Sequence, residues 1–557
     1  MTANKKKKKT AKKDFKVLIV YPNLYMALVP AIAIGLFARI FRDQGYDVDL
    51  FDTSYYDNDG TDFNESRFSF AENRVKILNA RKFDLKKDLG VTTNKSDMLQ
   101  DFRRRVETFQ PDFLVFSVVD DTFLQSLAML RAVEDLDIPH LMGGVFPTFA
   151  PKRCMEAAEV RLIGPGEGED TVLAVAEAIA KGESLDGIAG TWWKSDDGEV
   201  KKYQQRPLTD INKVIPDYSL YDKSRFMRPM GGRVFKMIPI ETFRGCPYAC
   251  TYCGSPSQRA FATKHDLGNF MRRKTMDMLR AEIKDHIERY DPEFVFFIDD
   301  SFLARPRQEI FDFCDMYEEF NLPFWCETRA ENCDPEILSR LKEVNCYRIS
   351  FGLEAGNEQY RNKVLRRKIT NDEIIQRFKW IAESGIAYSL NVIIGMPGET
   401  RDLVMDTIEL IRAMPGYDSL TSFIFTPYYG TTLRQVAVKN GWLDADVMTQ
   451  HYSAPSLLKM PPPYLSADEI RGLMATLPLY CYFPKSEWPN LRLAEADTEE
   501  GLKIRKPYAD IYTKNFLGEN QDFEKIYLDG SEDKIQNSPD RMDEAALARL
   551  MGPSSPL

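Results

Sequence analysis

The sequence lacks several features that would assign it to common classes of protein. No apolar run approaches the roughly 18–20 residues that a membrane-spanning helix needs. The basic start MTANKKKKKTAKKD is not followed by an apolar stretch of the signal-peptide type. The nine cysteines in 557 residues are too few and too scattered for a disulfide framework, and the net charge of -10 argues against a general nucleic-acid binder. We therefore expect a cytoplasmic protein in a reducing compartment, with no transmembrane segment and no nucleic-acid partner.

A chain of this length predicts two or three domains. Residues 1–13 are expected to be a disordered basic tail, and 14–185 form a first domain in which short apolar strands such as KVLIVYP alternate with helices. The polar stretch 53–105 interrupts that alternation and reads as an insertion. Repeated strand–helix alternation predicts a parallel sheet covered on both faces, a doubly wound α/β domain.

A second α/β series follows a linker, residues 186–234, that contains a hairpin with its turn at Asp197–Gly198. Six apolar strands, from PIETFR to SLTSFIFTPYY, alternate with helical patterns at 275–290, 306–320, 334–344, 371–384 and 400–413. Six βα units predict a partial barrel over 235–434, with its site at the carboxyl ends of the strands. A mostly helical C-terminal domain over 435–527 and a flexible tail over 528–557 complete the expectation.

Three of the cysteines form a metal-binding pattern. RGCPYACTYCGSP places Cys246, Cys250 and Cys253 at C-x3-C-x2-C spacing directly after a strand. Thiolates are soft, strongly donating ligands that suit iron, and three of them can hold three irons of a cubane while the fourth iron stays open to an amino-carboxylate ligand. Zinc is the other interpretation, but it would require a fourth ligand nearby, for which His265 is the only candidate.

The cysteine motif resembles the signature of the radical S-adenosylmethionine superfamily, C-x3-C-x-aromatic-C, with Tyr252 as the aromatic residue. Later segments resemble the family's strand ends in the expected order: FFIDDSF (Phe296–Phe302), GLEAGNE (Gly352–Glu358), NVIIGMPGET (Asn391–Thr400) and PYYGT (Pro427–Thr431). Taken singly, these segments could equally be helix caps and turns.

The resemblance implies that the cysteine trio binds a [4Fe–4S] cluster whose electron cleaves S-adenosylmethionine to a 5′-deoxyadenosyl radical, with a flavodoxin- or ferredoxin-type donor. Glu354 would hydrogen-bond the ribose or amino group of S-adenosylmethionine, and the backbone at Ile394 and Gly395 would approach its adenine. The residues implied in binding S-adenosylmethionine are Tyr252, Asp299, Glu354, Ile394, Gly395 and Pro427.

The first domain lacks G-x-G-x-x-G after its first strand, so a dinucleotide site is disfavoured. It resembles the cobalamin-binding domain of B12-dependent radical enzymes in Tyr21-Pro22-Asn23, in MGGVFPT (Met142–Thr148) and in GPGEGED (Gly164–Asp170). The residues implied in binding cobalamin are Asn23, Ser117, Gly143, Gly144, Gly166 and Glu167. Other cobalamin proteins carry D-x-H-x-x-G, but no histidine follows the first strand here. The lower face of cobalt is therefore expected to be open, or met by water or another residue, and His140 is expected at the surface.

Together, the two resemblances imply a C-methyltransferase that acts on an unactivated carbon of a small-molecule or lipid-like substrate. A B12-dependent cyclase or rearrangement enzyme, which transfers no methyl group, is the alternative. A methylthiotransferase is disfavoured because that class resembles this one in its barrel but needs a second cysteine trio, and only Cys154 precedes Cys246. A non-catalytic cobalamin carrier or light sensor is disfavoured because the cluster motif is intact.

Overall fold

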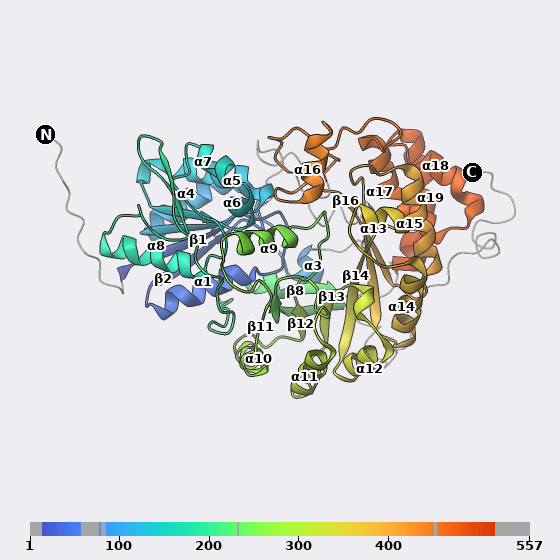
Figure 1. Cartoon of the computed structure of the whole chain (residues 1–557), viewed down its shortest axis with the longest axis horizontal. Helices are drawn as coiled ribbons and strands as arrows, with labels where there is room; N and C mark the ends of the chain where they lie inside the picture. The colour runs from blue at the N-terminus through green and yellow to red at the C-terminus, as the bar shows by residue number, and fades with distance from the viewer. Residues whose placement is uncertain (1–13, 57–76, 80–84, 231–232, 450–453, 518–557) are drawn as a thin grey trace.

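The computed structural model describes residues 14–56, 77–79, 85–230, 233–449 and 454–517. In this part of the chain two seven-stranded sheets lie side by side, and a helical region packs beyond the second sheet (Figure 1). None of the described helices is long and apolar enough to span a membrane. The two tails expected at 1–13 and 528–557 lie outside the described residues.

The N-terminal sheet is a doubly wound parallel sheet, as the strand–helix alternation predicted. Its strands run in the order β2-β1-β3-β4-β5-β6-β7, and β1 to β5 pair in parallel. The strands are β1 (Lys16–Tyr21), β2 (Asp47–Asp52), β3 (Phe113–Ser117), β4 (His140–Gly143), β5 (Leu162–Gly164), β6 (Trp192–Lys194) and β7 (Val200–Lys202). The expected hairpin is present as β6 and β7, and it extends this sheet by pairing antiparallel with β5.

Helices cover both faces of this sheet. Successive strand residues point to opposite faces: Val17 and Ile19 pack with α1 and α8 in one core, whereas Leu18 and Val20 pack with α4 and α5 in another. Burial on both faces is the reason that the four central residues of β1, 17–20, are all apolar. The helices are α1 (Ile32–Asp43), α3 (Leu85–Leu89), α4 (Met98–Phe109), α5 (Phe123–Ala132), α6 (Val145–Phe149), α7 (Pro151–Glu156) and α8 (Glu169–Lys181). The stretch 53–105 contains α3 and the start of α4, and its residues 57–76 and 80–84 lie outside the described residues.

The second sheet is the predicted partial barrel. Its order is β16-β15-β14-β13-β12-β9-β8, with six parallel strands and β8 antiparallel at one edge. The strands are β8 (Met227–Met230), β9 (Arg233–Ile240), β12 (Phe294–Phe297), β13 (Phe324–Thr328), β14 (Cys346–Glu354), β15 (Ala387–Ile394) and β16 (Ser419–Ile424). A separate two-stranded ribbon, β10 (Phe243–Arg244) and β11 (Arg272–Arg273), follows β9.

The helices of the barrel are α9 (Ser255–Lys264), α10 (Met276–Tyr290), α11 (Arg307–Tyr317), α12 (Pro335–Glu343), α13 (Glu358–Lys363), α14 (Asn371–Glu383) and α15 (Arg401–Ala413). Five of them, α10, α11, α12, α14 and α15, occupy the predicted positions, whereas α9 and α13 were not predicted. The C-terminal region is helical, with α16 (Thr432–Lys439), α17 (Ala467–Tyr482), α18 (Trp488–Ala494) and α19 (Glu499–Tyr512). Helix α17 packs on α15 and β16, so the C-terminal helices close the β16 side of the barrel.

Candidate active site

The cysteine loop begins where β10 ends and is shaped by a glycine. Gly245 has φ +106°, and a Cβ there would lie 2.7 Å from the carbonyl oxygen of Phe270, so a side chain would not fit. Each of the three thiols then meets a donor. The backbone N–H of Tyr248 donates to Cys246, Arg329 Nη1 lies 3.6 Å from Cys250 Sγ, and the N–H of Ser255 lies 3.4 Å from Cys253 Sγ.

This donor set fits a cubane better than a zinc ion. No three His, Cys, Asp or Glu side chains of the described residues converge to hold one metal ion, whereas each cysteine of a cubane binds its own iron. His265 instead packs its ring on Phe261, 4.7 Å between centroids. Burial raises the pKa of Cys246 to about 11 and that of Cys253 to about 12, so both thiols need a bound cation to ionise at neutral pH.

Tyr252 and Glu354 come together at the carboxyl end of β14. The Tyr252 hydroxyl donates to Glu354 Oε1 at 3.2 Å, and Arg367 Nη1 donates to both, at 3.0 and 3.4 Å. Glu354 has φ +66°, where the pairing with β15 shifts register after Gly352. A non-glycine residue in this left-handed conformation is strained, and here the strain is held at the predicted S-adenosylmethionine site.

The two aspartates that follow β12 have different surroundings. Asp299 is fully buried and accepts hydrogen bonds from the N–H groups of Thr242 (2.7 Å) and Phe243 (3.1 Å) and from Arg305 Nη2 (2.8 Å). Asp300 lines a cavity, described below, between the barrel and the N-terminal sheet, and it accepts from Ser255 Oγ at 3.1 Å. Asp299 therefore anchors the segment at Thr242 and Phe243 that leads into the cysteine loop. Asp300 is the carboxylate that a ligand in the cavity would meet.

The other predicted adenosyl contacts lie at the ends of β15 and β16. Ile394 is buried, and Gly395 has φ +78°, with the side chain of Ile470 only 2.7 Å from where its Cβ would be. The N–H of Gly395 donates to the buried Glu399 at 2.5 Å. The carbonyl of Pro427 accepts from Arg434 Nη1 at 2.7 Å. Their roles in binding remain predictions.

A cavity of about 360 Å³ separates the N-terminal sheet from the cysteine loop. Five of the six residues predicted to bind cobalamin line it on one side, and residues of the barrel line the other. The five are Ser117, Gly143, Gly144, Gly166 and Glu167; the facing residues include Arg244, Gly245, Ile298 and Asp300. Two exposed apolar side chains, Val145 (41%) and Ile298 (37%), also line the cavity.

The glycines of this wall leave room for a flat ligand. A Cβ on Gly143 would meet nothing closer than 3.8 Å, so this wall is bare backbone. Gly144 has φ +110°, and a Cβ there would lie 2.5 Å from the carbonyl oxygen of Val118, which excludes any other residue. The bare backbone at Gly143 fits a corrin ring lying against the strand ends, where ligands of doubly wound sheets bind, whereas glycine at position 144 is required by its packing on Val118.

Two residues of the N-terminal domain lie away from the cavity. Asn23 donates through Nδ2 to the carbonyl of Ala27 (2.9 Å) and to Ser54 Oγ (2.7 Å), so it stabilises the loop after β1. The expectation of a surface His140 was wrong. It is the first residue of the interior strand β4, is 9% exposed, and accepts from the N–H of Arg161. Burial lowers the pKa of His140 to about 4.

An ion-pair cluster between the domains borders the cavity and was not predicted. Glu167 pairs with Arg272 and Arg244, and Arg244 also pairs with Glu169 at 2.8 Å and Glu241 at 3.0 Å. Glu167 therefore ion-pairs with the barrel and also lines the cavity, and its role in binding cobalamin stays a prediction. The only feature of the sequence that pointed to this ion-pair cluster was the position of Arg244, two residues before Cys246.

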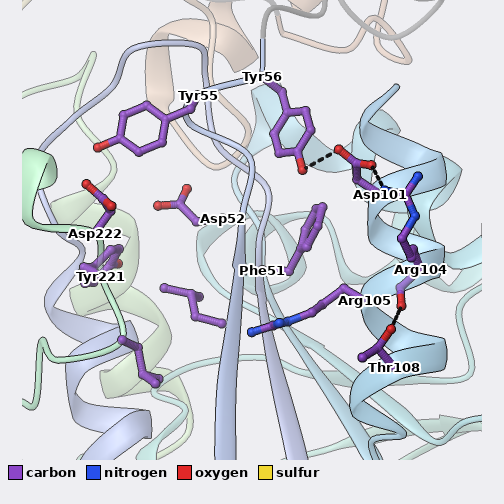
Figure 2. Close-up of a pocket in the computed structure, with 12 residues that line it drawn as sticks. Phe51, Asp52, Tyr55, Tyr56, Asp101, Arg104, Arg105, Thr108, Tyr221 and Asp222 are labelled. Carbon is purple, nitrogen blue, oxygen red and sulfur yellow. Dashed lines mark hydrogen bonds and ion pairs between the residues drawn. The ribbon is translucent and has the colours of Figure 1, made fainter. Parts of the chain in front are cut away.

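A second cavity, of about 490 Å³, lies on the β2 side of the N-terminal sheet between α4 and the segment around Tyr221 (Figure 2). The polar side chains lining it bond to the protein itself: Tyr56 to Asp101, Arg104 to Asp101, and Arg105 to Asp49. None of the residues predicted to bind a cofactor lines it, so the candidate site is the cavity beside the cysteines.

Comparisons with known proteins match both parts of this site. Residues 240–411 match the model of the Radical SAM superfamily, and residues 75–176 match the B12 binding domain. The chain is 25% identical over 378 residues to an uncharacterized methyltransferase of Pyrococcus horikoshii, covering 67% of this chain and 76% of that one. It is 23% identical over 331 residues to the anaerobic magnesium-protoporphyrin IX monomethyl ester cyclase of Rubrivivax gelatinosus, covering 57% of each. The fold resembles the radical S-adenosylmethionine methyltransferase TsrM from Kitasatospora setae, with a TM-score of 0.56 at 15% identity, covering 77% of this chain and 76% of that one.

Proposed function

We propose, from the premise that this chain belongs to the cobalamin-dependent radical S-adenosylmethionine enzymes, that it methylates an unactivated carbon of a small-molecule or lipid-like substrate. When bound, the cluster with S-adenosylmethionine supplies a radical that removes a hydrogen atom, and cobalamin supplies the methyl group. A flavodoxin- or ferredoxin-type protein of the cytoplasm is the proposed electron donor.

One observation carries the proposal: a single cavity is lined on one side by the predicted cobalamin residues and on the other by residues next to the cysteine loop. Gly143 and Gly144 from the N-terminal sheet face Gly245 and Asp300 of the barrel across it. Methyl transfer to a carbon that has just lost hydrogen requires both groups to reach the same atom, which this shared space allows.

The chain's own residues would bind the cluster, orient the Glu354 carboxylate and close the cavity between the two domains. Cys246, Cys250 and Cys253 would hold the cluster, and Tyr252 with Arg367 fixes the Glu354 carboxylate. Arg244 and the three carboxylates around it hold the two domains together beside the cavity. Closure of this kind excludes water, which protects reactive intermediates from side reactions.

A cyclase or rearrangement enzyme is the second candidate, because the relative from Rubrivivax gelatinosus is a cyclase. The two reactions differ in their by-products. Methylation with remethylation of cobalamin consumes two molecules of S-adenosylmethionine and forms 5′-deoxyadenosine and S-adenosylhomocysteine, whereas cyclisation forms no S-adenosylhomocysteine.

The test is anaerobic turnover of the enzyme reconstituted with iron, sulfide and cobalamin. The reaction contains a small-molecule extract from cells that express the gene and methyl-deuterated S-adenosylmethionine, and both by-products are counted by mass spectrometry. Equal amounts together with a deuterated product support methylation. 5′-Deoxyadenosine alone contradicts it. Cys250→Ala is the matched control, in which neither 5′-deoxyadenosine nor the deuterated product should form.

A further inference from the structure

Arg329 places a cation directly beside the cysteine loop. It follows β13, and its Nη1 lies 3.6 Å from Cys250 Sγ. Its guanidinium carbon lies 3.7 Å from the ring centroid of Tyr248, which stands between Cys246 and Cys250 in the sequence. The Arg329 side chain is only 8% exposed, so its charge is poorly screened by water.

The arginine is held in this place by its neighbours. Its Nη2 pairs with Glu331, and the Tyr248 hydroxyl donates to Asn332 Oδ1 at 2.6 Å. The segment 329–332 therefore contacts the cysteine loop through both the guanidinium and the asparagine. A planar guanidinium can stack on a ring and donate to sulfur at the same time, which a lysine cannot do.

A second arginine near the loop is engaged elsewhere. Arg367 donates to Tyr252, Glu354 and the carbonyl of Gly352. Its hydrogen bonds therefore serve the predicted S-adenosylmethionine site. Among the described residues, Arg329 is the arginine with a hydrogen bond to a cysteine of the trio.

We propose that Arg329 tunes the cluster by raising its reduction potential. Reduction adds one electron to a cluster that its thiolates already make negative, and no bond is formed or broken. A nearby positive charge and an N–H···S bond both stabilise the reduced form more than the oxidised form. Glu331 opposes the effect because its negative charge partly offsets that of Arg329. Arg329 is a positioning residue that acts on the cluster through Cys250. This inference depends on the chain binding the cluster, as proposed above, but not on which reaction the enzyme then catalyses.

The experiment measures the midpoint potential of the reconstituted full chain without S-adenosylmethionine. Anaerobic titration with dithionite as the one-electron donor is followed by the electron paramagnetic resonance signal of the reduced cluster, normalised to iron and sulfide content. The variants are Arg329→Gln, Arg329→Lys and Glu331→Gln. Arg340→Gln is the matched control, since it removes an equal charge from the outer helix α12.

The proposal predicts shifts of opposite sign. Arg329→Gln should have a more negative midpoint than the wild type, Glu331→Gln a more positive one, and Arg329→Lys a value between Arg329→Gln and the wild type. Arg340→Gln should leave the midpoint unchanged.

A purely structural role for Arg329 would lower cluster content without moving the midpoint of the clusters that remain, and this result overturns the proposal. If Arg329→Gln does not retain a cluster, Glu331→Gln decides: a midpoint unchanged from the wild type, or below it, also overturns the proposal. None of these readouts depends on methyl transfer, so a failure of the proposed reaction leaves them interpretable.

Discussion

Replacing Asp299 by asparagine should destabilise the barrel rather than simply weaken binding of S-adenosylmethionine. The carboxylate is fully buried and accepts from Thr242, Phe243 and Arg305. In Asp299→Asn one oxygen becomes an N–H donor facing other donors. Arg305, whose side chain is 3% exposed, loses its counter-ion.

Removing one partner of a buried ion pair costs about 3–5 kcal/mol because the remaining charge is uncompensated. We expect a loss of that size in the free energy of unfolding of Asp299→Asn. Since Thr242 and Phe243 lead from β9 into the cysteine loop, iron content should fall as well. The assay is anaerobic urea unfolding followed by tryptophan fluorescence, with iron measured per chain.

Asp300→Asn is the matched control, with the same chemical change one residue away. Asp300 is solvent-accessible in the cavity, so the variant should stay within about 0.5 kcal/mol of the wild type. The reasoning is refuted if Asp299→Asn unfolds like the wild type while losing affinity for S-adenosylmethionine, because the carboxylate would then be a ligand contact.

Two further predictions concern Gly144 and Glu399. Gly144→Ala should lose about 1–3 kcal/mol of stability through its backbone alone, because a φ of +110° is nearly exclusive to glycine, and more because the new Cβ would meet the Val118 carbonyl. Gly182→Ala, with φ +69° and open space around it, should lose only the cost of the left-handed backbone, about 1–2 kcal/mol. Equal thermal melting points for the two variants would contradict this. Burial raises the pKa of Glu399 from 4.5 to about 8, so the folded state holds a proton that the unfolded state releases, and this group makes stability fall as pH rises from about 4.5 to 8. Glu399→Gln should therefore gain stability relative to the wild type across that range by up to about 1.4 kcal/mol per pH unit in urea unfolding, and a difference that stays constant with pH would disprove the assignment.

Much of the architecture could be predicted from local patterns. The apolar run of β1 and the six later strands reflect burial on both faces of parallel strands, and this requirement acts residue by residue along the chain. The cysteine spacing was equally local, because a short loop brings Cys246, Cys250 and Cys253 together without help from distant segments. These are the properties that the sequence alone determined: two α/β units, their order, and an iron-binding loop at the start of the second.

Side-chain direction and inter-domain contact were decided only by the tertiary structure. Adjacent aspartates look alike in a sequence, and packing alone turned Asp299 into the protein and left Asp300 in the cavity. The ion pairs of Glu167 with Arg244 and Arg272 were not predicted, because only the approach of the barrel to the N-terminal domain brings these side chains together. The contact of Arg329 with Cys250 joins residues 79 positions apart. Ion pairs and hydrogen bonds act over a few ångströms in space, and the separation of residues in the sequence carries no record of those distances.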